Sequence, residues 1–253
     1  MAGNSTTPGV SVSARLLAVL AAFDPDHRSL SLTAIAQRAD VPLATAHRLI
    51  RELVSWGALV RRPSGEYVVG RRLWDVGLLA PVQADLREVA SPFLHDIYGA
   101  TLATVHLAVR DGHEALYLDR LAGHASVPVV SKVGSRLPLH ATGVGKVLLA
   151  HAPAPVVRSV LDDLVAATPY TVTQPGRLAR QLRQVREEGF AQTVDEMTIG
   201  ACSVAVPVHG PDDDVVAALG IVVPDLRRDR GRLVAALDVA ARGISRSLPS
   251  GFH

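Results

Sequence analysis

Several residue types that build common chemical sites are scarce in this chain of 253 residues. It has one cysteine, Cys202, which cannot close an intramolecular disulfide or form a cysteine-rich zinc site, and this favours a reducing compartment. No apolar run reaches the roughly 18 residues of a membrane-spanning helix, and the amino terminus lacks a charged stretch followed by an apolar one. We therefore expect a cytoplasmic protein with no membrane partner.

Motifs that assemble enzyme active sites are also missing. The sequence has no Gly-x-Ser-x-Gly, His-Glu-x-x-His or Cys-x-x-Cys, and its ten histidines are scattered. The TGVGK stretch at residues 142–146 fails as a nucleotide-binding loop, because His140 replaces its first glycine and Val147 its final serine or threonine. A thiol nucleophile formed by Cys202 with His106 or His140 is disfavoured, since Cys202 lies in an apolar strand pattern. The sequence predicts no catalytic residue, metal or cofactor.

Residues 31–56 contain two short helical patterns joined by a polar turn. Ser31 or Thr33 is available to cap the first. The second begins after Pro42, which a first helical turn tolerates. Its apolar stripe and its polar face lie on opposite sides; the stripe comprises Ala46, Leu49, Ile50 and Leu53, and the polar face Thr45, His47, Arg48 and Arg51.

A basic hairpin follows these helices. Residues 58–60 and 67–69 read as two short strands around a turn, with Arg61 and Arg62 at its base. Residues 27–72 hold eight arginines against three acidic residues, a surplus of five, whereas the whole chain has a net charge of only +2. Positive charge is therefore concentrated on a predicted winged helix-turn-helix.

This order of elements suits the insertion of the second helix into a DNA major groove. We expect sequence readout from Thr45, His47 and Arg48. A solvated basic face or a protein-docking module would explain the charges but not this order, and is the weaker interpretation. The predicted DNA-binding residues are Thr33, Thr45, His47, Arg48, Arg51, Arg61, Arg62 and Arg71.

Composition and periodicity divide the chain into four parts. Residues 1–9 are predicted to be a disordered tail, 10–70 the DNA-binding domain, 71–85 a linker helix and 86–253 a second domain. The linker is more hydrophobic than a free helix requires, with Trp74, Leu78 and Leu79, and this suggests a dimer contact.

The second domain is predicted to have an α+β fold, an antiparallel sheet covered by helices. From residue 101 the pattern alternates, with His106 and Ala108 expected on one face of a strand and Leu107 and Val109 on the other. Asp111-Gly112 marks a hairpin over residues 102–121. Further strands are expected at 127–133, 190–194, 203–208 and 215–223, and helices at 143–150, 155–166, 178–188 and 230–248. Pro81 and Pro92 are expected to punctuate the helices between residues 70 and 98.

Four stretches in this order resemble the IclR-type transcriptional regulators over nearly the whole chain: SLTAIAQRADVPLATAHRLIRELVSWGAL with GEYVVGRRLWDVG, ATVHLAVRDGHEALYLDRLAG, LPLHATGVGKVLLA, and EEGFAQTVDEMTIGACSVAVPV. The resemblance implies a winged helix-turn-helix domain, a linker helix and a GAF-like effector-binding domain. It also implies a homodimer that commonly pairs into a tetramer, and regulation of nearby genes through a pseudo-palindromic operator.

The resemblance further implies an effector pocket. Two departures from members that bind small keto acids bear on the ligand: Thr193 replaces an aspartate, and Gly220 and Val222 replace two serines. A small, highly polar ligand would lose partners there, which favours an aromatic or medium-sized carboxylic acid, or a related carbonyl compound. The implied pocket residues are Val129, Leu137, Gly143, Val144, Thr193, Cys202, Gly220 and Val222.

The amides of residues 143–145, at a helix start, could hold the anionic end of such a ligand, although a plain glycine-rich helix entry explains them equally well. Asp195 and Glu196 are predicted to lie in a solvated loop, and the arginine stripe of residues 177–186 on a solvated helix face. We thus expect a ligand-responsive regulator, a repressor rather than an activator. A small-molecule-binding enzyme and a ligand-independent architectural DNA-binding protein are the alternatives.

Overall fold

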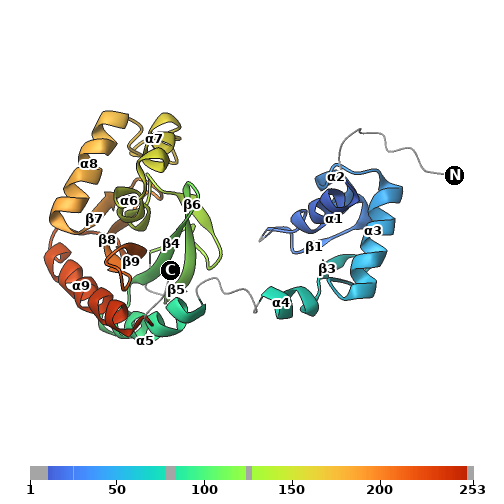
Figure 1. The fold of residues 1–253 in the computed structure, drawn as a ribbon, viewed down its shortest axis with the longest axis horizontal. Coiled ribbons are helices and arrows are strands. Elements are labelled where there is room, and N and C mark those ends of the chain that lie inside the picture. Colours follow the sequence, from blue (N-terminus) through green and yellow to red (C-terminus); the bar gives the residue numbers. More distant parts are fainter. Residues whose placement is uncertain (1–10, 25, 78–83, 124–126, 250–253) are drawn as a thin grey trace. The chain divides into compact units, whose positions relative to one another are not determined.

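Helices α1 to α4 and a small sheet are the described elements of the amino-terminal unit (Figure 1). The computed structural model describes residues 11–24, 26–77, 84–123 and 127–249, and it divides into units of residues 1–82 and 83–253. The expected tail, 1–9, lies outside the described residues, as do residues 78–83 of the expected linker. The first three helices are α1 (Val12–Ala21), α2 (Leu32–Arg38) and α3 (Leu43–Trp56).

Local sequence explains where these helices begin and end. The Ser31 side chain caps α2 by accepting from the Ala34 amide at 3.2 Å. Gly57, in the left-handed conformation, ends α3. The apolar stripe predicted for α3 is buried in the core of this unit, where it packs with Val19 and Ile35.

The hairpin forms as predicted. Its strands are β2 (Leu59–Arg61) and β3 (Tyr67–Val69), and the short β1 (Ser29–Leu30), which the sequence did not indicate, pairs with β3. Helix α4 (Arg71–Gly77) follows, with Trp74 59% exposed. Leu78 and Leu79 lie outside the described residues.

The carboxy-terminal unit is built on a six-stranded antiparallel sheet in the order β6-β5-β4-β9-β8-β7. The hairpin predicted around Asp111-Gly112 is its β4–β5 pair. The strands are β4 (Thr104–Asp111), β5 (Glu114–Leu121), β6 (Arg136–Pro138), β7 (Ala191–Val194), β8 (Cys202–His209) and β9 (Val215–Val223).

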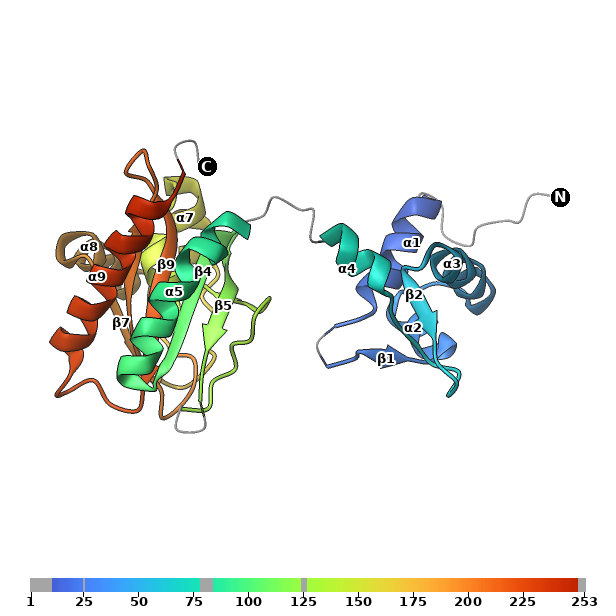
Figure 2. The ribbon, with the colours of Figure 1, turned by 90° about the horizontal axis from the view of Figure 1, so that it is seen from below.

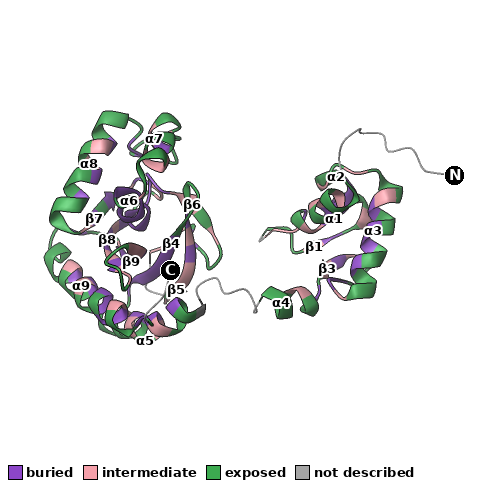
Figure 3. Cartoon of the chain, in the orientation of Figure 1, coloured by how far each residue is buried: buried purple, intermediate pink, exposed green. Residues whose placement is uncertain are grey.

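Helices cover both faces of this sheet (Figure 2). Helices α5 (Ala84–Thr101) and α9 (Arg230–Ser247) cover one face. The other face packs against α6 (Gly143–Ala150), with α7 (Ala154–Asp162) and α8 (Pro175–Glu188) beyond it. Figure 3 shows that α6 is buried throughout, whereas α8 and α9 are exposed on their outer sides. Among the described residues no helix is long and apolar enough to cross a membrane.

Three expectations about this unit are wrong. Residues 127–133 form no strand; Ser131 instead hydrogen-bonds the His106 side chain at 2.8 Å, and the strand that pairs with β5 is β6. Pro92 does not interrupt a helix but lies inside α5. Helix α7 ends at Asp162, short of the expected residue 166.

Candidate functional site

The exposed face of α3 and the hairpin form one basic surface. His47, Arg48 and Arg51 are exposed on α3, and Arg61 and Arg62 are exposed on the hairpin. A shallow groove is lined by His47 and Arg51 of α3 and by Arg61, so the two elements meet. The structure therefore brings together most of the predicted DNA-binding residues.

The remaining predicted residues lie nearby on other elements or are less accessible. Thr45 is half-buried in the first turns of α3, and Thr33 is exposed on α2. Arg71 begins α4, where it pairs with Asp75 at 3.6 Å and stays 86% exposed. Arg38, another arginine of this unit, has a structural role, since its Nε donates to the Ala22 carbonyl at 2.7 Å.

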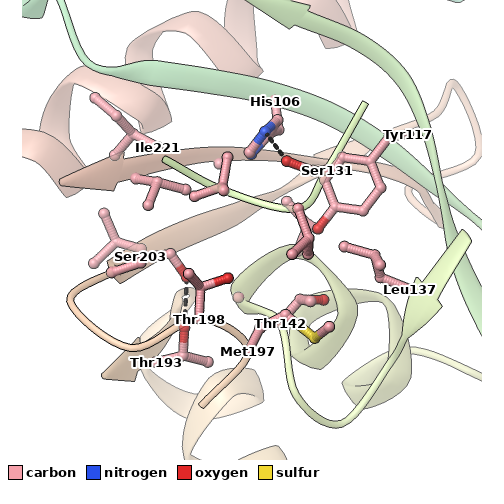
Figure 4. A pocket seen from close by; sticks show the side chains of 18 residues that line it. His106, Tyr117, Ser131, Leu137, Thr142, Thr193, Met197, Thr198, Ser203 and Ile221 are labelled. Carbon is pink, nitrogen blue, oxygen red and sulfur yellow. Dashed lines mark hydrogen bonds between the residues drawn. The ribbon is translucent and has the colours of Figure 1, made fainter. Parts of the chain in front are cut away.

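A pocket opens in the carboxy-terminal unit on the sheet face that carries α6 (Figure 4). Seven of the eight implied effector residues line it, all except Cys202. Cys202 does not line this pocket, because successive residues of a strand point to opposite faces. Its neighbour Ser203 lines the pocket, while Cys202 packs in the core beneath α5 and α9.

Helix α6 supplies one wall through its first residues. Gly143 and Val144 line the pocket, so the positive end of the helix dipole faces it. The Gly145 amide, also expected to face a ligand, is not available, because it donates to the capping Thr142 Oγ1 at 3.0 Å. The groups left for an anion are the amides of Gly143 and Val144.

Polar residues that the sequence analysis missed lie across the pocket from α6. His106 is 4% exposed, its Nε2 lies 2.8 Å from Ser131 Oγ, and its ring packs edge-on against Tyr117 with centroids 4.9 Å apart. Burial, assisted by the charge of Arg120, lowers the pKa of His106 to about 3, so the imidazole is neutral at pH 7. Burial also raises the pKa of Tyr117 to about 12, so the phenol keeps its proton. The alternation in β4 placed His106 on this face but gave no sign of its partners.

The residues at which this chain differs from members that bind small keto acids lie together on a third wall of the pocket. Thr193 Oγ1 lies 2.6 Å from Ser203 Oγ, and Gly220 and Val222 leave apolar surface beside them. Met197 and Thr198 complete this side. The described residues that line the pocket include no lysine, arginine, aspartate or glutamate. The pocket therefore combines apolar walls, neutral polar groups and one helix start.

The expectation of a solvated acidic pair is wrong for Glu196. Its carboxylate is buried and accepts from Lys146 Nζ at 2.6 Å. Asp195 is only partly exposed, and its Oδ1 accepts from the Gly200 amide at 2.6 Å. Within the described parts of the chain, no three His, Cys, Asp or Glu side chains are grouped so as to hold a metal ion.

A helix-turn-helix with a basic hairpin, joined to a separate unit with a pocket, defines a DNA-binding transcriptional regulator. Two family models match the chain: the IclR helix-turn-helix domain over residues 13–63, and the bacterial transcriptional regulator IclR C-terminal domain over residues 80–246. The chain belongs to the IclR family of bacterial transcriptional regulators.

Individual relatives are similar to this chain over most of their length. The chain is 31% identical to the HTH-type transcriptional regulator XynR of Escherichia coli K12, over 92% of this chain and 95% of the relative. It is 30% identical to the transcriptional repressor AllR of the same strain, over 97% and 93%. An IclR homolog from Microbacterium hydrocarbonoxydans, crystallised with 4-hydroxybenzoate, superposes with a TM-score of 0.90 at 35% identity, over 94% of this chain and 99% of the homolog. The protein is accordingly a regulator and not an enzyme.

Proposed function

We propose that this protein is a cytoplasmic repressor that binds a pseudo-palindromic operator and responds to an aromatic or medium-sized carboxylic acid, or a related carbonyl compound. The observation that carries the proposal is the pocket, where the start of α6 is the one feature suited to an anion among the described lining residues. We also propose a homodimer, formed through the exposed Trp74 and Val76 of α4, that pairs into a tetramer. A two-fold dimer accounts for a two-fold operator.

Operator readout is assigned to the first two turns of α3, with Thr45, His47 and Arg48 reaching base edges. Arg51, Arg61, Arg62 and Arg71 would contact phosphates, with Thr33 at the rim of the same surface. Phosphate contacts make binding fall steeply as salt rises, whereas base contacts decide which sequence is bound.

Replacing Arg48 by alanine is expected to relax sequence preference at one or two operator positions, at a cost of about 1–3 kcal/mol if the guanidinium pairs with guanine. Quantitative gel shifts with the DNA upstream of the gene, and with single-base variants of the bound site, would measure this. Arg62→Ala is the matched control, because loss of a phosphate contact should weaken all sequences alike and flatten the salt dependence by about one ion. An Arg48→Ala protein with an unchanged base preference would place readout elsewhere.

The effector proposal follows from the charges of the pocket. A carboxylate can accept from the amides of Gly143 and Val144, and an aromatic ring fits the apolar wall near Val222. At the far side, neutral His106 and Ser131 can accept and donate hydrogen bonds but cannot balance a second negative charge. The pocket thus favours a monocarboxylate with an uncharged hydroxyl at its other end. The 4-hydroxybenzoate bound by the Microbacterium homolog has this chemistry.

Calorimetry on the full chain would test this assignment with 4-hydroxybenzoate, benzoate, terephthalate, glyoxylate and pyruvate. We expect 4-hydroxybenzoate to bind best and terephthalate to bind at least about tenfold more weakly, since its second carboxylate would be buried without a counter-charge. Ser131→Ala should reduce the preference for 4-hydroxybenzoate over benzoate while leaving benzoate affinity near that of the unmodified protein. Val222→Ser should weaken all aromatic acids, because it places a hydroxyl beside the ring.

Two outcomes would contradict the effector class. Binding of the keto acids alone would show that the apolar wall is not a ligand contact. Equal affinity for 4-hydroxybenzoate and terephthalate would show that the His106 side of the pocket does not discriminate against a second carboxylate.

A further inference from the structure

Behind the pocket, one buried ion pair joins three segments of the carboxy-terminal unit. The Lys146 ammonium donates to the Glu196 carboxylate at 2.6 Å and to the Gln181 side-chain oxygen at 2.9 Å. The side chains of Lys146 and Glu196 are 1% and 7% exposed. Lys146 belongs to α6, Gln181 to α8, and Glu196 to the loop between β7 and β8. A single ammonium therefore connects two helices and a loop.

That loop, residues 195–201, is fastened at its base. The Asp195 amide donates to the Ala201 carbonyl at 3.0 Å, which closes the loop. The Asp195 and Glu196 carbonyls each accept a threonine hydroxyl at 2.6 Å, from Thr168 and Thr171 respectively. The anchored residues thus come first in the loop, directly before the part that reaches the pocket.

Met197 and Thr198 follow Glu196 and line the pocket (Figure 4). Three residues before Lys146 on the same short helix, Gly143 lines the wall that α6 supplies. Because Lys146 and Glu196 form an ion pair, the position of the Met197–Thr198 wall depends on the position of α6. This connection runs through side chains that do not themselves line the pocket.

We propose that Lys146 and Glu196 are positioning residues, which hold the Met197–Thr198 wall at a fixed separation from the start of α6 and so set the width of the ligand pocket. The ligand readout of this proposal rests on the proposed function; the proposal itself rests on the contacts of the free protein.

The energetics of buried charges favour a geometric role over a purely stabilising one. Burial lowers the pKa of Lys146, and the adjacent Glu196 carboxylate opposes that shift. The cost of desolvating the two charges therefore offsets much of the electrostatic attraction between them. Apolar residues of similar volume commonly stabilise such a position as well or better, but they form no directional bonds. Charge-assisted hydrogen bonds fix distance and angle. Replacement of both charged residues therefore separates geometry from stability.

The test compares the double variant Lys146→Met/Glu196→Leu with the unmodified full chain. We expect thermal stability close to that of the unmodified protein, whereas either single replacement alone should destabilise it by leaving a buried charge unpaired. In the ligand-free double variant, amides of residues 196–201 should exchange with solvent at least about tenfold faster, since local opening no longer breaks the ion pair. Affinity for the probe 4-hydroxybenzoate should fall about tenfold through lost preorganisation.

Ile244→Ala is the matched control. Ile244 is fully buried in the core on the other face of the sheet, so its truncation lowers stability without touching the loop. Amide exchange at residues 196–201 should not rise more than exchange in the rest of the unit. The affinity for 4-hydroxybenzoate should equal that of the unmodified protein.

Exchange in the double variant at the unmodified rate, or faster exchange spread evenly over the unit, would overturn the positioning role. If the unmodified chain binds no aromatic acid, the effector assignment fails, and the exchange measurement still decides this proposal.

Discussion

Replacing Gly145 by alanine is expected to destabilise the carboxy-terminal unit by about 3 kcal/mol, the sum of an overpacked site and a lost helix cap. A β-carbon on Gly145 would lie 2.4 Å from the Leu139 carbonyl oxygen and 2.5 Å from Thr142 Oγ1. The first is a backbone atom in a fully buried residue, so it cannot swing aside. The second accepts the Gly145 amide, so moving it breaks the cap of α6.

Chemical unfolding monitored separately in the two units would measure this effect. Both tryptophans, Trp56 and Trp74, lie in the amino-terminal unit, so their fluorescence should be unaffected, while amide exchange in the sheet strands reports the loss. Gly176→Ala is the control, because a β-carbon there meets nothing within 4 Å and alanine suits a helix. If Gly145→Ala stayed within about 0.5 kcal/mol of the unmodified protein, α6 would not be packed as described.

Acid is expected to weaken the carboxy-terminal unit through His106. In the unfolded chain this histidine gains a proton as the pH falls below 6.5, whereas in the folded protein burial delays protonation until about pH 3. Its contribution to stability is therefore complete above pH 6.5 and is lost as the pH falls from 6.5 towards 3. Linkage at about 1.36 kcal/mol per pH unit, over the two pH units from 6.5 to 4.5, predicts a loss of about 3 kcal/mol by pH 4.5.

His106→Asn isolates this effect, because asparagine keeps a polar group but does not titrate. The difference in the free energy of unfolding between the variant and the unmodified protein should narrow by about 3 kcal/mol from pH 7 to pH 4.5, since carboxylates titrate alike in both. A constant difference would mean that burial does not lower the pKa of His106.

Much of the fold follows from sequence periodicity, because one burial pattern decides each element. The alternation of β4 correctly separated His106 and Ala108 from Leu107 and Val109, and the stripe of α3 was buried as predicted. Residues 127–133 were misassigned because an apolar, β-branched run is equally suited to a pocket wall, and nothing local shows whether a partner strand is present.

The site was less predictable, since its chemistry depends on contacts between distant residues. Glu196 and Lys146 are 50 positions apart, so no local pattern indicated a buried carboxylate. The same holds for His106 and Ser131, separated by 25 positions. Cys202 was assigned one residue out of register, and in a strand a shift of one residue reverses the face.

The alternation of β4, β8 and β9 also bears on how new specificities arise in such a regulator. Ser203, Gly220 and Val222 line the pocket, while Val206 and Leu219 on the same strands pack beneath α5 and α9. Substitutions at every second residue can therefore change the recognised compound while the opposite hydrophobic layer keeps the sheet folded. Ligand specificity can therefore change during evolution without unfolding the protein. A mutant library restricted to those positions should yield variants with altered ligand specificity that still fold.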